Sequence, residues 1–97
     1  MSTGNTTEIL AARAAEALNE ASKSATEASR ALDEVSKAAE RVKETAARPH
    51  SAEHSQARQQ LQEANARRHA ALAEQQAAHA RAEEAVAQWR KALGGPA

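Results

Sequence analysis

The chain has no cysteine, phenylalanine or tyrosine, and its 97 residues include only three glycines, two prolines and one tryptophan. The lack of cysteine excludes a disulfide framework and any zinc site built on thiolates. Its glycines are Gly4, Gly94 and Gly95, so no glycine-rich loop is available to hold a phosphate group. Several common kinds of catalytic and cofactor-binding site are therefore excluded before any pattern is considered.

An excess of charge of one sign is also missing. Lysine and arginine number 13, aspartate and glutamate number 13, and the two kinds are spread over both halves of the chain. Binding to nucleic acid depends on an excess of basic residues and on aromatic side chains for base stacking, so we expect no nucleic-acid partner. The basic run Arg67-Arg68-His69 is interpreted as a solvated face or an ion pair with Asp33 or Glu34.

No long apolar run occurs. Residues 1–20 contain Glu8, Arg13, Glu16 and Glu20, which does not fit a signal peptide, and no stretch approaches the ~18 apolar residues of a membrane span. We therefore expect no integral membrane segment and a cytoplasmic protein. Export that does not depend on a signal peptide stays open as an alternative.

Large apolar residues are scarce, whereas 28 of the 97 residues are alanine. An enclosed pocket needs large side chains to line it, so we expect no enzyme activity, no cofactor and no metal site. The twelve large apolar residues are Met1, Ile9, Leu10, Leu18, Leu32, Val35, Val42, Leu61, Leu72, Val86, Trp89 and Leu93.

The first half of the chain predicts one long helix. Asn5 and Glu8 stand at the spacing of a capping box, which places a helix start after a flexible tail at 1–6. From there to Arg48 the sequence has no glycine or proline and is rich in residues that favour a helix. Pro49 cannot continue the helix, so we expect a helix at 7–48 and a turn at 49–50.

The second half predicts a second long helix. Ser51 can serve as its N-cap, and Glu53 is an acidic residue in its first turn. The run Gly94-Gly95-Pro96 is typical of a C-terminal stop. We therefore expect a helix at 51–93, a flexible tail at 94–97, and a single helical-hairpin domain over 7–93.

A heptad pattern predicts how the two helices pack. In the first helix, apolar residues recur every seven positions in two rows, which indicates a left-handed coiled coil with close helix axes. The rows are 11, 18, 25, 32, 39, 46 and 14, 21, 28, 35, 42. The second helix has a wider stripe, at 57, 61, 64, 71, 78, 82, 85, 89 and 92, beside the row Leu72, His79, Val86, Leu93. Folding at Pro49 pairs residues whose numbers add to about 100, and it brings Leu18 against Ala82.

The run His50-Ser51-Ala52-Glu53-His54 has the spacing of the H-x-x-E-H zinc motif found in inverted zinc peptidases. That chemistry also needs a third protein ligand and a substrate cleft. Pro49 places His50 outside the second helix, so we interpret these residues as a polar turn and a helix start. Adventitious metal binding is the alternative.

Two further residues allow two interpretations each. Trp89 is interpreted as a packing anchor that forms a plug with Ile9, Leu10 and Leu93, and a role in partner binding is the alternative. His79 interrupts an otherwise apolar row. We interpret it as a boundary residue with its ring tip in water, with a pH-sensitive position as the alternative.

Together these patterns predict an all-α fold, an antiparallel two-helix hairpin with an alanine-rich coiled-coil seam, which pairs with a second hairpin into a four-helix bundle. The expected function is a non-catalytic protein–protein interaction or assembly module, with itself as partner in a homodimer, another helical protein, or both. The alternatives are a secreted helical-hairpin substrate or secretion-associated partner, and a stress-protectant or lipid-surface amphipathic helix. The candidate interface residues are Leu10, Leu18, Leu32, Val35, Val42, Leu61, Leu72, His79, Val86, Trp89 and Leu93.

Overall fold

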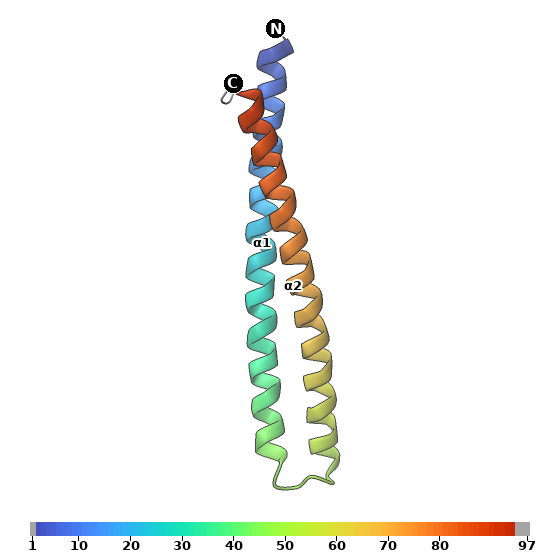
Figure 1. Cartoon of the computed structure of the whole chain (residues 1–97). Helices are drawn as coiled ribbons and strands as arrows, with labels where there is room; N and C mark the ends of the chain where they lie inside the picture. The colour runs from blue at the N-terminus through green and yellow to red at the C-terminus, as the bar shows by residue number, and fades with distance from the viewer. Residues whose placement is uncertain (1, 95–97) are drawn as a thin grey trace. The chain divides into compact units, whose positions relative to one another are not determined.

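Two long helices make up the computed structural model of the chain: α1 at Ser2–Thr45 and α2 at Ala52–Ala92, which run in opposite directions (Figure 1). The structure describes residues 2–94, and their side chains from residue 6 onward. Within this part of the chain there is no β-strand. The predicted antiparallel helical hairpin is confirmed, whereas its pairing into a four-helix bundle stays a prediction.

The start of α1 differs from the prediction. The helix begins at Ser2 and not at residue 7, so residues 2–6 continue the helix where a tail was expected. A helix that is already formed extends at low cost when no proline stops it, and none lies in this stretch. Asn5 is therefore inside the helix and does not act as its N-cap. The side chain of Asn5, residue 1 and the expected tail at 95–97 lie outside the described residues.

The end of α1 is also earlier than predicted, at Thr45 and not at residue 48. Pro49 explains the difference, because a proline clashes with the carbonyl group four residues before it and cannot donate to that group. The Thr45 carbonyl instead accepts from the backbone N–H of Arg48 at 3.0 Å. The connection between the helices consequently covers residues 46–51, where a turn at 49–50 was predicted.

Both signals predicted for α2 are present. At its start, the Ser51 hydroxyl accepts from the backbone N–H of His54 at 3.1 Å, as an N-cap residue does, and Glu53 lies in the first turn. At its end, α2 stops at Ala92, one residue short of the predicted limit, and Gly94 has a φ of 82°. That left-handed conformation is the one in which glycine commonly ends a helix.

The chain divides into two compact units, each of which contains a piece of both helices. The turn unit is Thr26–Ala73, and it contains the connection between α1 and α2. The terminal unit consists of the described residues of Met1–Ala25 and Glu74–Ala97. Each unit is treated separately below.

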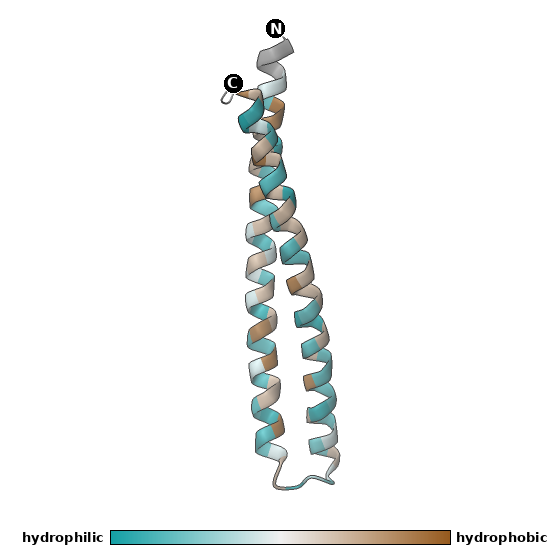
Figure 2. Cartoon of the chain, viewed as in Figure 1, coloured by the Kyte–Doolittle hydropathy of each residue, from teal (hydrophilic) through white to brown (hydrophobic). Residues whose placement is uncertain are grey.

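The buried core of both units is made of alanine. Strongly hydrophobic residues are few and are scattered along ribbons that are otherwise hydrophilic or neutral (Figure 2). Because alanine has only a methyl group, such a core forms where two helices approach closely. The buried hydrophobic residues are Ala14, Ala28, Ala31, Ala57, Ala64, Ala78 and Ala82.

One of the two seam rows predicted for α1 is wrong by one residue. The row that faces α2 contains the buried Ala31, whereas its neighbour Leu32 in the predicted row is 47% exposed. Leu18, also in the predicted row, is 52% exposed. The facing positions of α2 are small, Ala64 among them, and a leucine row would hold the helices too far apart for these methyl groups to touch. The stripe predicted for α2 is confirmed, since each of its positions is buried or half-buried.

Candidate interaction surface

Beside the alanine seam, the space between the two helices is open to solvent in both units, and its chemistry differs from one unit to the other. In the turn unit, this open side is lined mainly by charged and amide side chains. We call this surface the polar groove; it is formed by Glu34, Lys37, Ala38, Arg41, Gln60, Glu63, Ala64 and Arg67.

Two contacts bridge the polar groove from one helix to the other. The Nε of Arg67 lies 3.4 Å from Oε1 of Glu34, and Nη1 of Arg41 donates to Oε1 of Gln60 at 3.0 Å. The first contact confirms the predicted ion pair between the basic run and Glu34. The side chains of this pair are half exposed, so the pair orients the helices more than it stabilises them.

The terminal unit carries an apolar hollow between its two helices. We call it the apolar groove; it is lined by Leu18, Ala21, His79, Ala82, Glu83, Val86, Ala87 and Arg90. Leu18 and Ala82 lie in it together, which confirms the register predicted for that pair. Its charged groups, Glu83 and Arg90, both belong to α2.

His79 lies on the rim of the apolar groove and not inside a packed seam. Its side chain is 70% exposed, and its Nε2 lies 3.6 Å from Oε2 of Glu83, one helical turn further along α2. This position agrees with the interpretation of a boundary histidine whose ring tip is in water.

On α1, the flank next to the seam has no charged residue from residue 11 to residue 39. In the terminal unit it carries Ala11, Ala15, Leu18 and Ser22, and in the turn unit it carries Ser29, Leu32, Ser36 and Ala39. At the same heptad spacing, the flank ends at the charged residues Glu8 and Lys43. An uncharged flank with exposed leucines is unusual on a solvent-facing helix, which normally has charged residues there.

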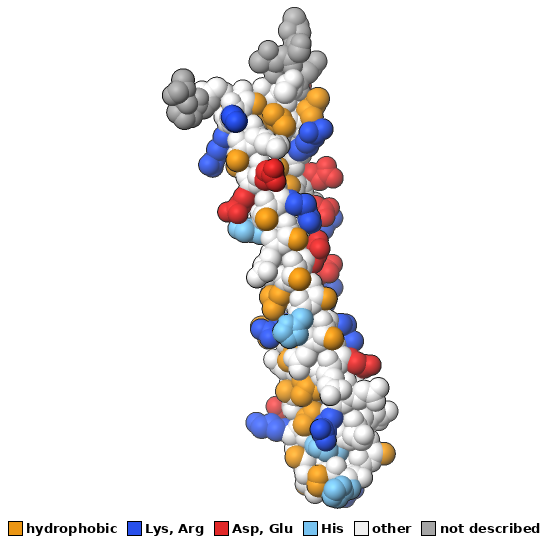
Figure 3. All heavy atoms as spheres, turned by 45° about the vertical axis from the view of Figure 1, so that its right-hand side comes forward, with side chains coloured by type: hydrophobic (Ala, Val, Ile, Leu, Met, Phe, Trp, Pro, Cys, Tyr) orange, Lys and Arg blue, Asp and Glu red, His pale blue; other side chains and the backbone are white. Residues whose placement is uncertain are grey.

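Hydrophobic side chains are accordingly visible at the surface, in patches between charged and histidine side chains (Figure 3). The large ones that are most exposed are Ile9, Leu18, Leu32 and Leu93. Scattered single apolar residues need no explanation. Here, however, three leucines are exposed while the buried hydrophobic residues of the described chain are all alanine, which is the reverse of ordinary burial.

The candidate interface residues fall into two classes of exposure. Leu18, Leu32, His79 and Leu93 are exposed, and the remainder are half-buried along the edges of the seam. The half-buried residues are Leu10, Val35, Val42, Leu61, Leu72, Val86 and Trp89.

The plug predicted around Trp89 is not closed. Trp89 is half-buried, while Ile9 is 52% exposed and Leu93 is 58% exposed. The alanine seam explains this, because helices that approach closely leave no room between them for an indole ring. The ring must then lie at the edge of the seam, where solvent reaches one side of it.

His54 is a structural residue that the sequence patterns did not identify. It is only 9% exposed, and its Nδ1 lies 2.9 Å from Oγ1 of Thr45 on the other helix. The Thr45 hydroxyl also donates to the carbonyl groups of Arg41 and Val42, so the imidazole joins the end of α1 to the start of α2. The interpretation of the histidine run as a polar turn and a helix start agrees with the structure, since His50 is exposed in the turn and His54 lies in the first turn of α2, but the burial of His54 was not predicted. The signal was present in the heptad spacing from His54 to Leu61, which places both on the buried side of α2.

No group of three or more histidine or acidic side chains that could hold a metal ion is found among the described residues. Over the same part of the chain, neither helix has a stretch that is long and apolar enough to cross a bilayer.

Comparison with known proteins adds no relative, since no family model matches the chain and no curated protein or solved structure matches it.

Proposed function

We propose that this chain is a non-catalytic interaction module and that its apolar flank associates with a second copy of the chain, giving a four-helix bundle of two hairpins. Another helical protein that offers a similar apolar stripe is the alternative partner. The proposal concerns the exposed flank of α1 and the apolar groove, which carry the uncovered hydrophobic side chains.

The observation that supports the proposal is the inverted burial of leucine and alanine. Leu18 is 52% exposed and Leu32 is 47% exposed, whereas Ala64 is 1% exposed. Removing apolar surface from water contributes about 25 cal/mol per Å², so covering these leucines is favourable. A partner that covers Leu18 would bury apolar surface without disturbing the alanine seam.

The weakness of the seam supports the same proposal. A methyl group loses little surface on burial, while each ordered residue costs about 1–2 kcal/mol of backbone entropy. High helix propensity offsets only part of that cost. An isolated hairpin with this seam is marginally stable, so folding would be linked to association.

A four-helix bundle is the arrangement that fits a hairpin with one uncovered flank. Helices in such bundles pack about 20° from antiparallel around a shared core, and a second hairpin supplies the two missing helices. A two-fold axis is the commonest symmetry for such a pair, because the same flank then serves both copies.

Sedimentation equilibrium, combined with thermal melts from about 5 to about 500 μM protein, tests the proposal. We expect a dimer at the higher concentrations and a melting temperature that rises with concentration. A chain with both Leu18→Gln and Leu32→Gln should remain monomeric. Its matched control, Glu16→Gln with Arg30→Gln, changes two exposed residues on the charged side of α1 and should dimerise like the natural chain. A natural chain that stays monomeric throughout, with a concentration-independent melt, would contradict the proposal.

A further inference from the structure

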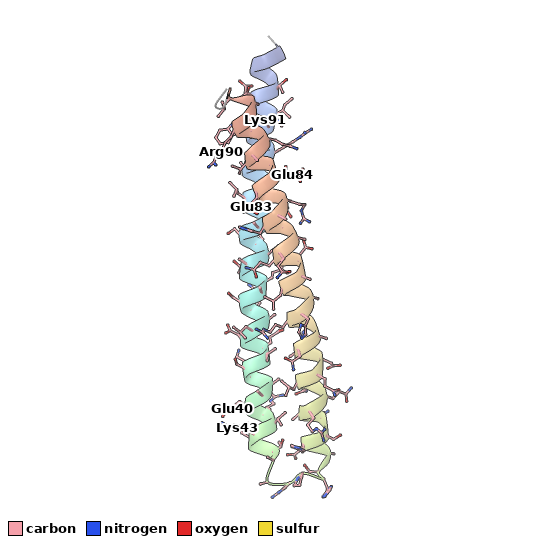
Figure 4. The ribbon with its side chains drawn as sticks, viewed as in Figure 1. Glu40, Lys43, Glu83, Glu84, Arg90 and Lys91 are labelled. Carbon is pink, nitrogen blue, oxygen red and sulfur yellow. The ribbon has the colours of Figure 1, made fainter. Side chains whose placement is uncertain are left out.

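The rim of the apolar groove carries one acidic and one basic residue, Glu83 and Arg90, which are two helical turns apart. Glu83 and Arg90 both line the groove, both are exposed, and both belong to the last turns of α2 (Figure 4). Residues seven apart lie on the same face of a helix, about 10 Å from each other along its axis. That distance is too long for an ion pair within α2, so each charge is available to a partner.

The same segment is complementary to itself when two copies run in opposite directions. With the midpoint between Val86 and Ala87 as the centre, Glu83 of one copy lies opposite Arg90 of the other. Val86 then lies opposite Ala87, and Leu93 lies opposite Ala80. On the face of the segment that contains Glu83 and Arg90, Val86 and Leu93 each meet an alanine and each of the two charges meets its opposite. Both relations occur twice because of the two-fold symmetry.

We infer that the proposed association of two copies takes place at their terminal units: residues 79–94 of one chain, which are the end of α2 and the two residues after it, pack antiparallel on the same residues of the other, with Glu83 of each copy paired to Arg90 of its partner. The inference rests on the proposed self-association and assigns it a surface and a register, in which Leu18 and Leu93 lie within the overlap of the two copies and Leu32 lies outside it. Leu18 of α1 lies in the same groove as Val86, so the apolar side chains of the arriving helix meet a hydrophobic floor.

Glu83 is already placed for this role. The His79 ring lies 3.6 Å from its carboxylate, on the side towards the start of α2, and limits the positions that the Glu83 side chain can adopt. Its side chain is still 72% exposed, so the carboxylate remains open to a guanidinium group from outside. Charge pairs of this kind select the partner and the register more than they add affinity, since the apolar contacts supply the free energy.

A second pair on α2 offers a natural comparison. Glu84 and Lys91 have the same spacing and opposite charges, and they too are exposed (Figure 4). The side chains beside them on the side away from the groove are Ala77 and Gln88, which are small or polar, and neither Glu84 nor Lys91 lines the apolar groove. This face therefore has matched charges without the apolar contact that a stable association needs, and it serves as the control surface.

The test uses charge reversals in the full chain, with dissociation constants from sedimentation equilibrium. Glu83→Lys places two basic residues opposite each other at both ends of the interface, and Arg90→Glu places two acidic ones there. Each single variant should raise the dissociation constant about tenfold or more, since two attractive contacts become repulsive. The double variant Glu83→Lys with Arg90→Glu should return to within about threefold of the natural chain, because its pairs are again complementary.

Mixing the two single variants separates contact between chains from any effect within one chain. In an equimolar mixture, the heterodimer has complementary charges at both ends, so native mass spectrometry should detect it well above the half share expected from random exchange. A mixture of Glu84→Lys with Lys91→Glu has the same changes in net charge and should show only the random share. At protein concentrations where each variant is dimeric, the circular dichroism spectrum should be unchanged, because the substituted residues are exposed.

Suppose that the natural chain dimerises but the first mixture shows no preference for the heterodimer, or the control mixture shows an equal preference. Either result would overturn this register and leave the assembly proposal standing. A natural chain that is monomeric at all concentrations would overturn both.

Discussion

The turn unit and the terminal unit share the alanine seam but hold their helices together differently. In the turn unit, polar contacts cross from one helix to the other, as in the Arg67–Glu34 ion pair and the contact between Thr45 and His54. In the terminal unit, the Arg81–Glu74 ion pair and the contact between His79 and Glu83 run along α2, and an apolar groove lies between the helices. The alanine seam is thus reinforced by contacts across the helices in the turn unit, whereas in the terminal unit an apolar hollow lies beside it.

The largest expected effect on the free energy of unfolding comes from a substitution in the alanine seam, which both units share. Ala64→Leu places three extra carbon atoms where the side chain is 1% exposed, so the helices must separate or the leucine must distort. We expect unfolding free energy to fall by about 3 kcal/mol, measured by urea denaturation. Ala66→Leu, at an exposed position of the same helix, should be nearly neutral. Equal effects of the two substitutions would show that close approach of the helices is not what stabilises the hairpin.

Trp89 is the largest side chain of the terminal unit, and its removal tests how much that end depends on its own packing. A fully buried tryptophan costs about 3–5 kcal/mol on replacement by alanine, and Trp89 is only half-buried. We therefore expect Trp89→Ala to cost about 2 kcal/mol, measured by thermal melts below the concentration at which dimers form. A cost near zero would mean that the indole ring does not stabilise the isolated hairpin, which would favour a role in binding a partner.

His54→Ala tests the contact that joins the helices in the turn unit. It removes the hydrogen bond to Thr45 from a site that is 9% exposed, so we expect a loss of about 1–2 kcal/mol. His50→Ala, at an exposed position in the turn, is the control and should change the melting temperature little. If His54→Ala were as harmless as its control, the difference between the two units would rest on the Arg67–Glu34 ion pair and the Arg41–Gln60 hydrogen bond.

The smallest effect is expected at that ion pair. Arg67→Gln should cost no more than about 0.5 kcal/mol, because the side chains of Arg67 and Glu34 are 60% and 50% exposed. The cost should shrink further in 0.5 M salt, which screens exposed charges. A loss that is larger and insensitive to salt would mean that the arginine contributes through the packing of its apolar stem.

Much of the fold could be predicted because its signals are local. Pro49 ends one helix, Ser51 begins the next, and Gly94 closes it, and each acts through the geometry of a few neighbouring residues. The start of α1 was missed because Asn5 had a capping pattern in a stretch where nothing obliges the helix to stop. Helix ends are decided by small free energies, so a single pattern is weak evidence there.

The candidate site was harder to predict, and the seam row explains why. A heptad pattern marks positions 11, 18, 25 and 32 as apolar, yet the row beside them, which contains Ala31, is the buried one. Periodicity reports which side of a helix is apolar but not which of two neighbouring rows faces a given partner when the apolar side is wide. His54 was missed for a related reason, since its partner Thr45 is brought to it only by the turn.

The amino-acid sequence by itself determined the helical class, the place of the turn and the shortage of large side chains for a core, because these follow from local backbone preferences and from composition. Only the tertiary structure decided that alanines form the seam while Leu18 and Leu32 remain at the surface. The physical reason is that the distance between the two helices is a property of both together. Small residues on α2 allow a close approach, and that approach leaves no space inside for the leucines of α1.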